Sequence, residues 1–250
     1  MAKVKHIRQF TIGPLVPVDR FNRGKHYVKV VTEDRTHHGM MYKEGLNIDI
    51  EPLGDPPKAS PAEGRIYFTT LEFLPHLCGY GALITKSLLI AELTIPDNAK
   101  LVLDPNGREY KTDKVNVLKF WDMNDFLEYV KYVEISCNAD FRLLKSARGL
   151  EHLERIGGMA FFSNLKSAKG LESLRSIGGR AGFFDLETAK GLDSLESIGE
   201  NAYFENITST RGLENLESIG GAAFFNNLKK EEVVHIKIGE SLRTKEGWNE

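Results

Sequence analysis

One phrase recurs at a fixed interval of 21 residues through the second half of the chain. Every copy opens with glycine and leucine and then carries leucine, isoleucine, alanine and phenylalanine at constant offsets. The opening glycines are Gly149, Gly170, Gly191 and Gly212, and the phenylalanines are Phe162, Phe183, Phe204 and Phe225. A strict period of this length is typical of a solenoid, in which each unit buries its apolar face only by stacking on its neighbours.

Each unit contains several glycines and is too short for two helices with turns, which excludes a helical solenoid. The Ala-x-Phe tripeptide alternates like a strand, so we expect its alanine and phenylalanine to point inward and the residue between them outward. A weaker copy with Ile135 and Phe141 precedes the four clear ones. We therefore predict a short β solenoid of about five 21-residue coils over residues 135–232, with the four repeated phenylalanines in one buried column. The units resemble irregular leucine-rich repeats over residues 135–228.

Two charged columns share the register of the repeat. Basic residues precede the opening glycines and acidic residues follow them: Arg148, Lys169, Lys190 and Arg211, then Glu151, Glu172, Asp193 and Glu214. Stacked like charges repel, so a neighbouring column of opposite sign favours the stack. We interpret both columns as a solvated structural device; phosphate binding by the basic column is the alternative.

The first half of the chain contains no repeat and reads as a compact α+β domain. The stretches 26–32, 88–95, 100–103 and 114–120 have the composition of strands, and a short helix is expected to begin at Thr69 or Thr70. Asp122 is expected to cap a helix or turn that leads into the first coil. The predicted layout is a head domain (1–122), a junction (123–134), the solenoid (135–232) and a C-terminal cap and tail (233–250).

Four motifs within residues 27–120 occur in a fixed order: a histidine-glycine pair, YKEGLN, GRIYFTT and a tyrosine-glycine pair. They begin at His38, Tyr42, Gly64 and Tyr80, and the stretch from Ile90 to Leu118 follows them. This run resembles the N-terminal domain of ankyrin-repeat proteins of giant amoeba-infecting DNA viruses (mimivirus-like). The resemblance implies a viral origin and a modular layout without a catalytic mechanism, and leucine-rich coils stand where ankyrin repeats are expected.

One enzymatic hypothesis fits the order of residues in the head domain. ADP-ribosyltransferases often place a histidine-glycine pair, a tyrosine on a later strand and a glutamate on a third strand around NAD. His38, Tyr67 and Glu92 follow that order. We favour the alternative in which Gly39 is a turn glycine and the aromatics are packed, because such residues often occur together by chance.

Other chemistries find less support. The sequence contains no P-loop, no dinucleotide-binding glycine motif and no zinc-protease or nucleophile-elbow motif. Adjacent His37 and His38 would face opposite sides of a strand, so no shared metal is expected. Cys78 and Cys137 have no zinc spacing and are expected to be buried thiols. We expect no cofactor, no nucleic-acid partner at a formal net charge of -2, and no membrane insertion.

The outward positions of the alternating stretch suggest where a partner binds. Phe161, Gly182, Tyr203 and Phe224 point outward in the predicted strands, flanked by Met159 and Arg180. Contiguous exposed aromatics usually mark an interaction site, although cover by the chain itself or simple stacking of the rings are alternatives. We predict a soluble, non-enzymatic protein-interaction protein with a viral or host protein partner. We expect it in the cytoplasm of the producing cell or in the virion.

Overall fold

The computed structural model describes residues 27–51, 66–77, 88–103 and 109–249. The motifs at Gly64 and Tyr80, together with Cys78 and the expected turn near residue 105, lie wholly or partly outside the described residues. The chain divides into two compact units. The first unit comprises residues 1–71 and 91–120, and the second comprises residues 72–90 and 121–250.

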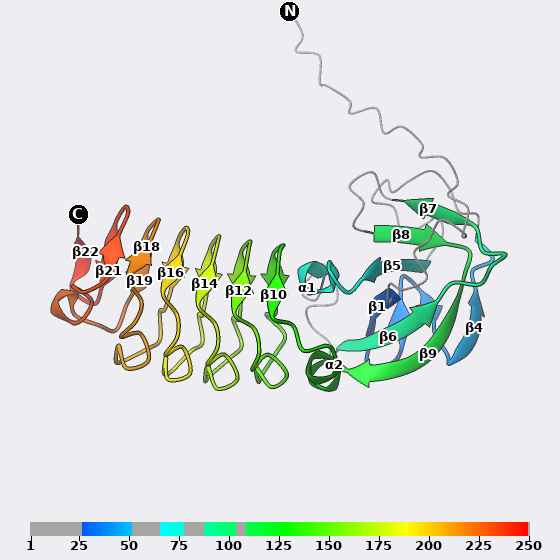
Figure 1. Cartoon of the computed structure of the whole chain (residues 1–250), viewed down its shortest axis with the longest axis horizontal. Helices are drawn as coiled ribbons and strands as arrows, with labels where there is room; N and C mark the ends of the chain where they lie inside the picture. Colours follow the sequence, from blue (N-terminus) through cyan, green and yellow to red (C-terminus); the bar gives the residue numbers. More distant parts are fainter. Residues whose placement is uncertain (1–26, 52–65, 78–87, 104–108, 250) are drawn as a thin grey trace, which may run out of the picture. The chain divides into compact units, whose positions relative to one another are not determined.

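A seven-stranded sheet of order β4-β9-β6-β1-β5-β8-β7 makes up most of the first unit (Figure 1), although residues 88–90 of β6 and 121–122 of β9 are assigned to the second. Its strands are β1 (Tyr27–Thr32), β4 (Gly45–Ile48), β5 (Ile66–Thr70), β6 (Leu88–Thr94), β7 (Leu101–Leu103), β8 (Glu109–Thr112) and β9 (Lys114–Asp122). A separate hairpin joins β2 (Thr36–His37) to β3 (Met40–Met41). Fully buried Val28, Ile66 and Ile90 hold the sheet's core. The expected short helix is present as α1 (Leu74–Leu77), but its predicted start at Thr69 or Thr70 is wrong, because both threonines belong to β5.

The second unit contains the predicted β solenoid. Each coil contributes one short strand to each of two parallel ladders, which follow one another from β10 onward in Figure 1. The six-stranded ladder consists of β10 (Glu134–Ile135), β12 (Arg155–Ile156), β14 (Ser176–Ile177), β16 (Ser197–Ile198), β18 (Ser218–Ile219) and β20 (Lys237–Ile238). The seven-stranded ladder consists of β11 (Ala139–Asp140), β13 (Ala160–Phe161), β15 (Ala181–Gly182), β17 (Ala202–Tyr203), β19 (Ala223–Phe225), β21 (Leu242–Thr244) and β22 (Gly247–Asn249).

The sequence period sets the register of both ladders. Ala160 pairs with Ala181, and Ile177 with Ile198, each 21 residues apart. The last step is shorter, because Ala223 pairs with Leu242 across 19 residues, with the short 3₁₀ helix η3 (Lys230–Glu232) between their strands. Strand β22 then turns back antiparallel to β21 and ends the ladder.

The predicted phenylalanine column is confirmed. Phe162, Phe183, Phe204 and Phe225 are fully buried, and their rings stack with centroids 5.2–5.4 Å apart. The glycines that open each unit permit this close stacking. Gly170 has φ +102°, and a Cβ placed there would lie 2.6 Å from the carbonyl oxygen of Ala147 in the previous coil. Glycine therefore meets both a backbone and a spatial requirement at this position.

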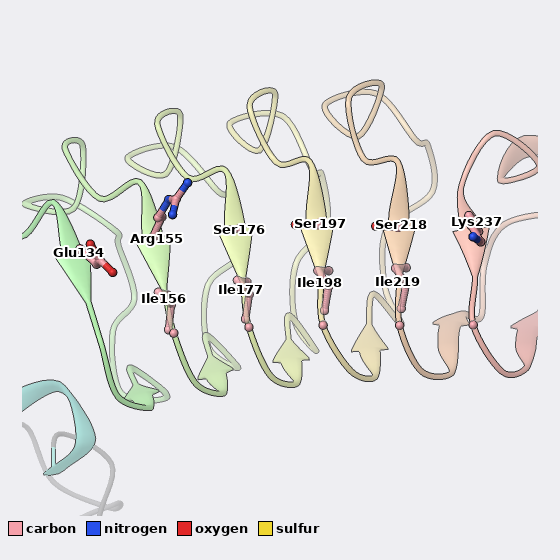
Figure 2. A pocket seen from close by; sticks show the side chains of 15 residues that line it. Glu134, Arg155, Ile156, Ser176, Ile177, Ser197, Ile198, Ser218, Ile219 and Lys237 are labelled. Atoms are coloured by element: carbon pink, nitrogen blue, oxygen red, sulfur yellow. The ribbon is translucent and has the colours of Figure 1, made fainter.

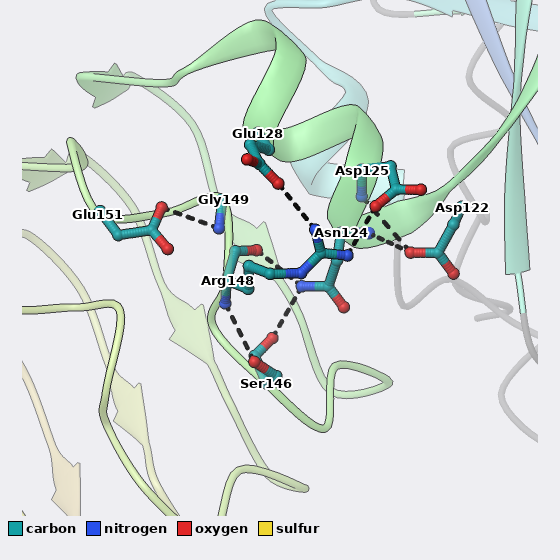
Figure 3. Close-up of polar contacts among 8 residues, drawn as sticks. All are labelled: Asp122, Asn124, Asp125, Glu128, Ser146, Arg148, Gly149 and Glu151. Carbon is teal, nitrogen blue, oxygen red and sulfur yellow. Dashed lines mark hydrogen bonds and ion pairs between the residues drawn. The ribbon is translucent and has the colours of Figure 1, made fainter.

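Helix α2 (Met123–Val130) covers the first coil (Figure 3). The Asp122 cap is confirmed, because its side chain accepts hydrogen bonds from the backbone of Asn124 and Asp125. The Asn124 amide donates to the carbonyls of Ser146 and Arg148 at 3.0 and 2.7 Å. The Asn124 side chain thus ties helix α2 to the turn that precedes Gly149.

The acidic column makes a backbone contact in addition to the expected charge balance. Each carboxylate accepts a hydrogen bond from the backbone N–H of the opening glycine two residues earlier, at 2.7–2.9 Å: Glu151, Glu172, Asp193 and Glu214. In the basic column, Arg148 pairs with Asp125 and Glu128 of α2 at 2.6 and 2.7 Å (Figure 3). The carboxylates therefore close the tight turn at a glycine whose φ is positive.

Candidate functional site

The outer face of the seven-stranded ladder carries a continuous row of aromatic side chains. We call Phe161, Phe184, Tyr203, Phe224 and Trp248 the aromatic strip. Its four Phe and Tyr rings are half-buried, and Trp248 is 59% exposed. Tyr203 stacks on Phe224 with centroids 4.7 Å apart and planes 13° apart, and the Trp248 ring meets Phe224 edge-on at 5.5 Å. The predicted residues Phe161, Tyr203 and Phe224 thus lie on one face, and the last two are in direct contact.

Phe184 closes the gap that Gly182 leaves in this row. A Cβ on Gly182 would lie 2.8 Å from Cε2 of Phe184 and 2.9 Å from Cδ1 of Phe161. The Phe184 ring also lies 5.1 Å from that of Tyr203. The ring comes from two residues further along the chain and fills the space above the glycine. Sequence reasoning missed Phe184, although a glycine followed by an extra aromatic two positions later was the available signal.

An arginine lies near each end of the strip. The guanidinium of Arg142 lies 5.9 Å from the centroid of Phe161, and that of Arg243 lies 5.6 Å from the ring of Trp248. Arg142 also donates two hydrogen bonds to the carboxylate of Asp140, at 2.8 and 2.6 Å. The two predicted flanking residues differ in exposure: Met159 is half-buried, whereas Arg180 is exposed and pairs with Glu200 at 3.4 Å.

A groove of about 500 Å³ runs along the six-stranded ladder on another face of the solenoid (Figure 2). Its walls repeat a Ser-Ile-Gly triplet, with Arg155 near one end and Lys237 at the other. The isoleucines are buried, whereas the half-buried serines Ser176, Ser197 and Ser218 form one column in register. Serine and glycine have small side chains, which leaves this face of the coils hollowed.

In the first unit, a polar cluster surrounds Lys29. Its fully buried ammonium donates to the carbonyl of Tyr67 at 2.8 Å and contacts Nδ1 of His37 at 2.7 Å. Burial lowers the pKa of Lys29 to about 7, and nearby Glu109 partly opposes that shift. Burial and the neighbouring Lys29 also lower the pKa of His37 and His38, so both imidazoles are neutral near pH 7.

The structure brings together two of the three residues of the enzymatic hypothesis. The rings of His38 and Tyr67 lie 5.4 Å apart. Glu92 is half-buried on β6, and β1 lies between β6 and the strand of Tyr67 in the sheet order. His38 and Gly39 form the turn of the β2–β3 hairpin with φ values of +49° and +72°. Such a turn requires positive φ at both positions, which accounts for the glycine structurally.

Two expectations about metal-binding residue types are wrong in detail. His37 and His38 do not face opposite sides, because the left-handed backbone at His38 brings the two rings within 4.0 Å. Cys137 is half-buried rather than buried, and its thiol contacts the carbonyl of Glu72 at 3.5 Å. Within the described part of the chain, no three potential metal ligands cluster.

The YKEGLN motif has a structural explanation. Tyr42 is buried, and its backbone N–H donates to the carbonyl of Arg35 at 2.8 Å. The side chain of Asn47 accepts from the N–H of Lys43 and donates to the carbonyls of Lys43 and Gly45. The motif therefore closes the loop before β4.

Comparison with known proteins indicates a relationship to mimivirus proteins. The chain is 31% identical over 94 residues to "Putative ankyrin repeat protein R868" of Acanthamoeba polyphaga mimivirus, covering 36% of the chain and 44% of that protein. It is 29% identical over 140 residues to "Uncharacterized protein R869" of the same virus, covering 53% of the chain and 96% of that protein. The chain thus spans less than half the length of the first relative. No family model matches it, and no solved structure is significantly similar.

These similarities support a protein of mimivirus type, in agreement with the resemblance seen in the head domain. None of the helices in the described ranges is long and apolar enough to cross a membrane.

Proposed function

We propose that the chain is a non-enzymatic protein-interaction protein whose solenoid presents the aromatic strip as its binding face. The observation that carries this proposal is the row of five neighbouring aromatic side chains on one face of a regularly stacked scaffold. Contiguous exposed apolar surface usually marks an interaction site, and aromatic residues dominate the energetics of protein interfaces. Solenoid faces commonly serve as binding surfaces.

The orientation of the rings favours a protein partner over a carbohydrate. The ring planes of Tyr203 and Phe224 are nearly parallel, so each ring covers one face of the other and the ring edges are left for a partner. Aromatic edges carry the positive part of the ring quadrupole and favour carbonyl oxygens and the faces of other rings. A sugar that stacks flat would need an open ring face instead.

The viral relationship suggests two settings for this interaction. We propose either a factor that contacts a host protein in the cytoplasm of the infected cell or a minor component of the virion. We also propose that the coils are an irregular form of leucine-rich repeat, because their leucines recur at fixed offsets and are fully buried: Leu150, Leu171, Leu192 and Leu213.

Capture of partners from infected-cell lysate and purified virions tests the proposal. The triple variant Phe161→Ser, Tyr203→Ser, Phe224→Ser is compared with the wild type. A matched control changes three serines of the other ladder to alanine: Ser176, Ser197 and Ser218. We expect the strip variant to lose a partner that the control keeps. If the folded strip variant retains every captured partner, the aromatic strip is not the face that binds those partners.

The second candidate is an ADP-ribosyltransferase-like enzyme that uses the solenoid to select its target. The proximity of His38 and Tyr67 favours it. It ranks second because the turn of the hairpin already accounts for His38 and Gly39, and because strand β1 separates β6, which carries Glu92, from β5. Calorimetric titration with NAD discriminates between the two functions.

A further inference from the structure

The pairing register of the seven-stranded ladder defines one outward column with an unusual order. Along the solenoid it reads Asp140, Phe161, Gly182, Tyr203, Phe224 and Arg243. If two copies of this column lie side by side in opposite directions, Asp140 lies against Arg243. Phe161 then lies against Phe224, and Gly182 against Tyr203. We propose that this face binds a second copy of the chain, with the two columns antiparallel about a two-fold axis.

The inference rests on the proposed function, since it takes the aromatic strip as a binding face and names the partner. At the centre of the pair, the ring of Phe184 occupies the space above Gly182 and so faces Tyr203 of the second copy. Phe161 faces Phe224 of that copy. Two-fold symmetry repeats each contact, so four aromatic pairs lie between the charged ends.

The charges at the ends select this orientation. Asp140 meets Arg243 of the second copy at both ends of the antiparallel pair. A parallel arrangement would instead place Asp140 against Asp140 and Arg243 against Arg243. Arg142 already binds Asp140, but a carboxylate offers about four lone-pair sites and can accept from a second guanidinium. Electrostatic complementarity of this kind fixes the register of an interface.

The dimensions of the face predict a weak dimer. Five steps of about 4.8 Å between coils give a length of about 24 Å. Each short strand with one residue before it and two after it spans five residues of about 3.3 Å, which gives a width of about 16 Å. Each copy would therefore contribute about 400 Å², below the roughly 800 Å² per partner of a standard interface. We expect dissociation constants in the micromolar range, so the dimer forms only at high protein concentration.

Sedimentation equilibrium from about 5 to 500 μM, a range chosen to bracket a micromolar dissociation constant, tests the proposal on the full chain. The single variants Arg243→Asp and Asp140→Arg each place like charges at both ends, and we expect at least a tenfold weaker self-association. Mixing the two variants restores opposite charges at both ends, so the mixture is expected to form a heterodimer. The control Lys237→Asp makes the same change of charge on the other ladder and is expected to leave dimerisation unchanged. Circular dichroism verifies that each variant is folded.

Two results would overturn this inference: a wild-type chain that stays monomeric throughout the range, or a dimer that the folded charge variants do not weaken. Either outcome leaves the proposed function standing if the triple strip variant loses a captured partner. Conversely, if the wild type dimerises as described and the strip variant keeps every captured partner, the inference holds and the hetero-partner function fails.

Discussion

Replacement of Phe183 with alanine tests how the solenoid is held together. The Phe183 side chain is fully buried between the rings of Phe162 and Phe204, at 5.3 and 5.2 Å with planes within 11° and 6°. Burial of a phenylalanine contributes about 1.5–3 kcal/mol, and each ring contact adds about 0.5–1.5 kcal/mol. Removal of the ring should therefore lower the free energy of unfolding by about 3–5 kcal/mol, as for other buried phenylalanines.

The same change near the end of the column provides a matched comparison. Phe225 has Phe204 on one side at 5.4 Å, whereas Thr244 is its partner in the register of the last coil. Because the stability of a solenoid is approximately a sum of unit and nearest-neighbour contributions, the end position loses one ring contact fewer. Phe225→Ala should cost about 1 kcal/mol less than Phe183→Ala.

Urea denaturation monitored by tryptophan fluorescence measures both costs. Trp121 stacks on Tyr129 of α2, next to the first coil, whereas Trp248 belongs to the last strand. The variant Trp248→Phe keeps Trp121 as its reporter near the first coil, and the variant Trp121→Phe keeps Trp248 as its reporter in the last strand. We expect Phe183→Ala to shift both reporters to lower urea. A cost below about 1 kcal/mol at Phe183, or a larger cost at Phe225, would refute the reasoning from nearest-neighbour stacking.

Three further predictions concern single residues. Gly170→Ala should destabilise the chain more than Gly39→Ala in denaturation experiments, because both glycines have positive φ but only the first would press a Cβ against backbone. Burial lowers the pKa of Lys29 from 10.5 to about 7, so the folded state binds fewer protons between these values and stability should rise with pH there, by up to about 1.4 kcal/mol per pH unit. Lys29→Met should abolish that rise in the pH dependence of unfolding; an unchanged slope contradicts the assignment. Calorimetry should detect no NAD binding, and binding that His38→Ala removes would favour the enzyme.

The sequence was sufficient to predict the solenoid, because each inward position of the coil repeats with a single period. Phe183 and Ala181 occur at the same offset as their counterparts in the other clear units, and both are fully buried. The pairing of Ala181 with Ala202 follows directly from that period. The head domain offered no such repetition, so its strands were recognised by composition while the sheet order was not predictable.

Local backbone conformation explains one error and one contact that the sequence did not indicate. His37 and His38 were placed on opposite sides by the alternation of a strand, but the positive φ of His38 belongs to a turn and brings the rings together. Glu172 was expected to balance the neighbouring basic column, and its carboxylate also accepts a hydrogen bond from the N–H of Gly170. In both cases the sequence identified the residues and the local geometry decided the contact.

The outward column shows why function was harder to predict than fold. Strictly repeated residues such as Gly178 are explained by packing, since a Cβ there would lie 2.3 Å from the carbonyl oxygen of Gly157. Positions that vary between units are not restricted by the close packing of the coils, so their side chains can contact a partner. Gly182 is the informative case, because it interrupts a row of aromatics and Phe184 restores the surface from a different position in the coil. A binding face in a repeat protein is therefore best sought where a residue departs from the repeat and a neighbouring side chain fills the space that it leaves.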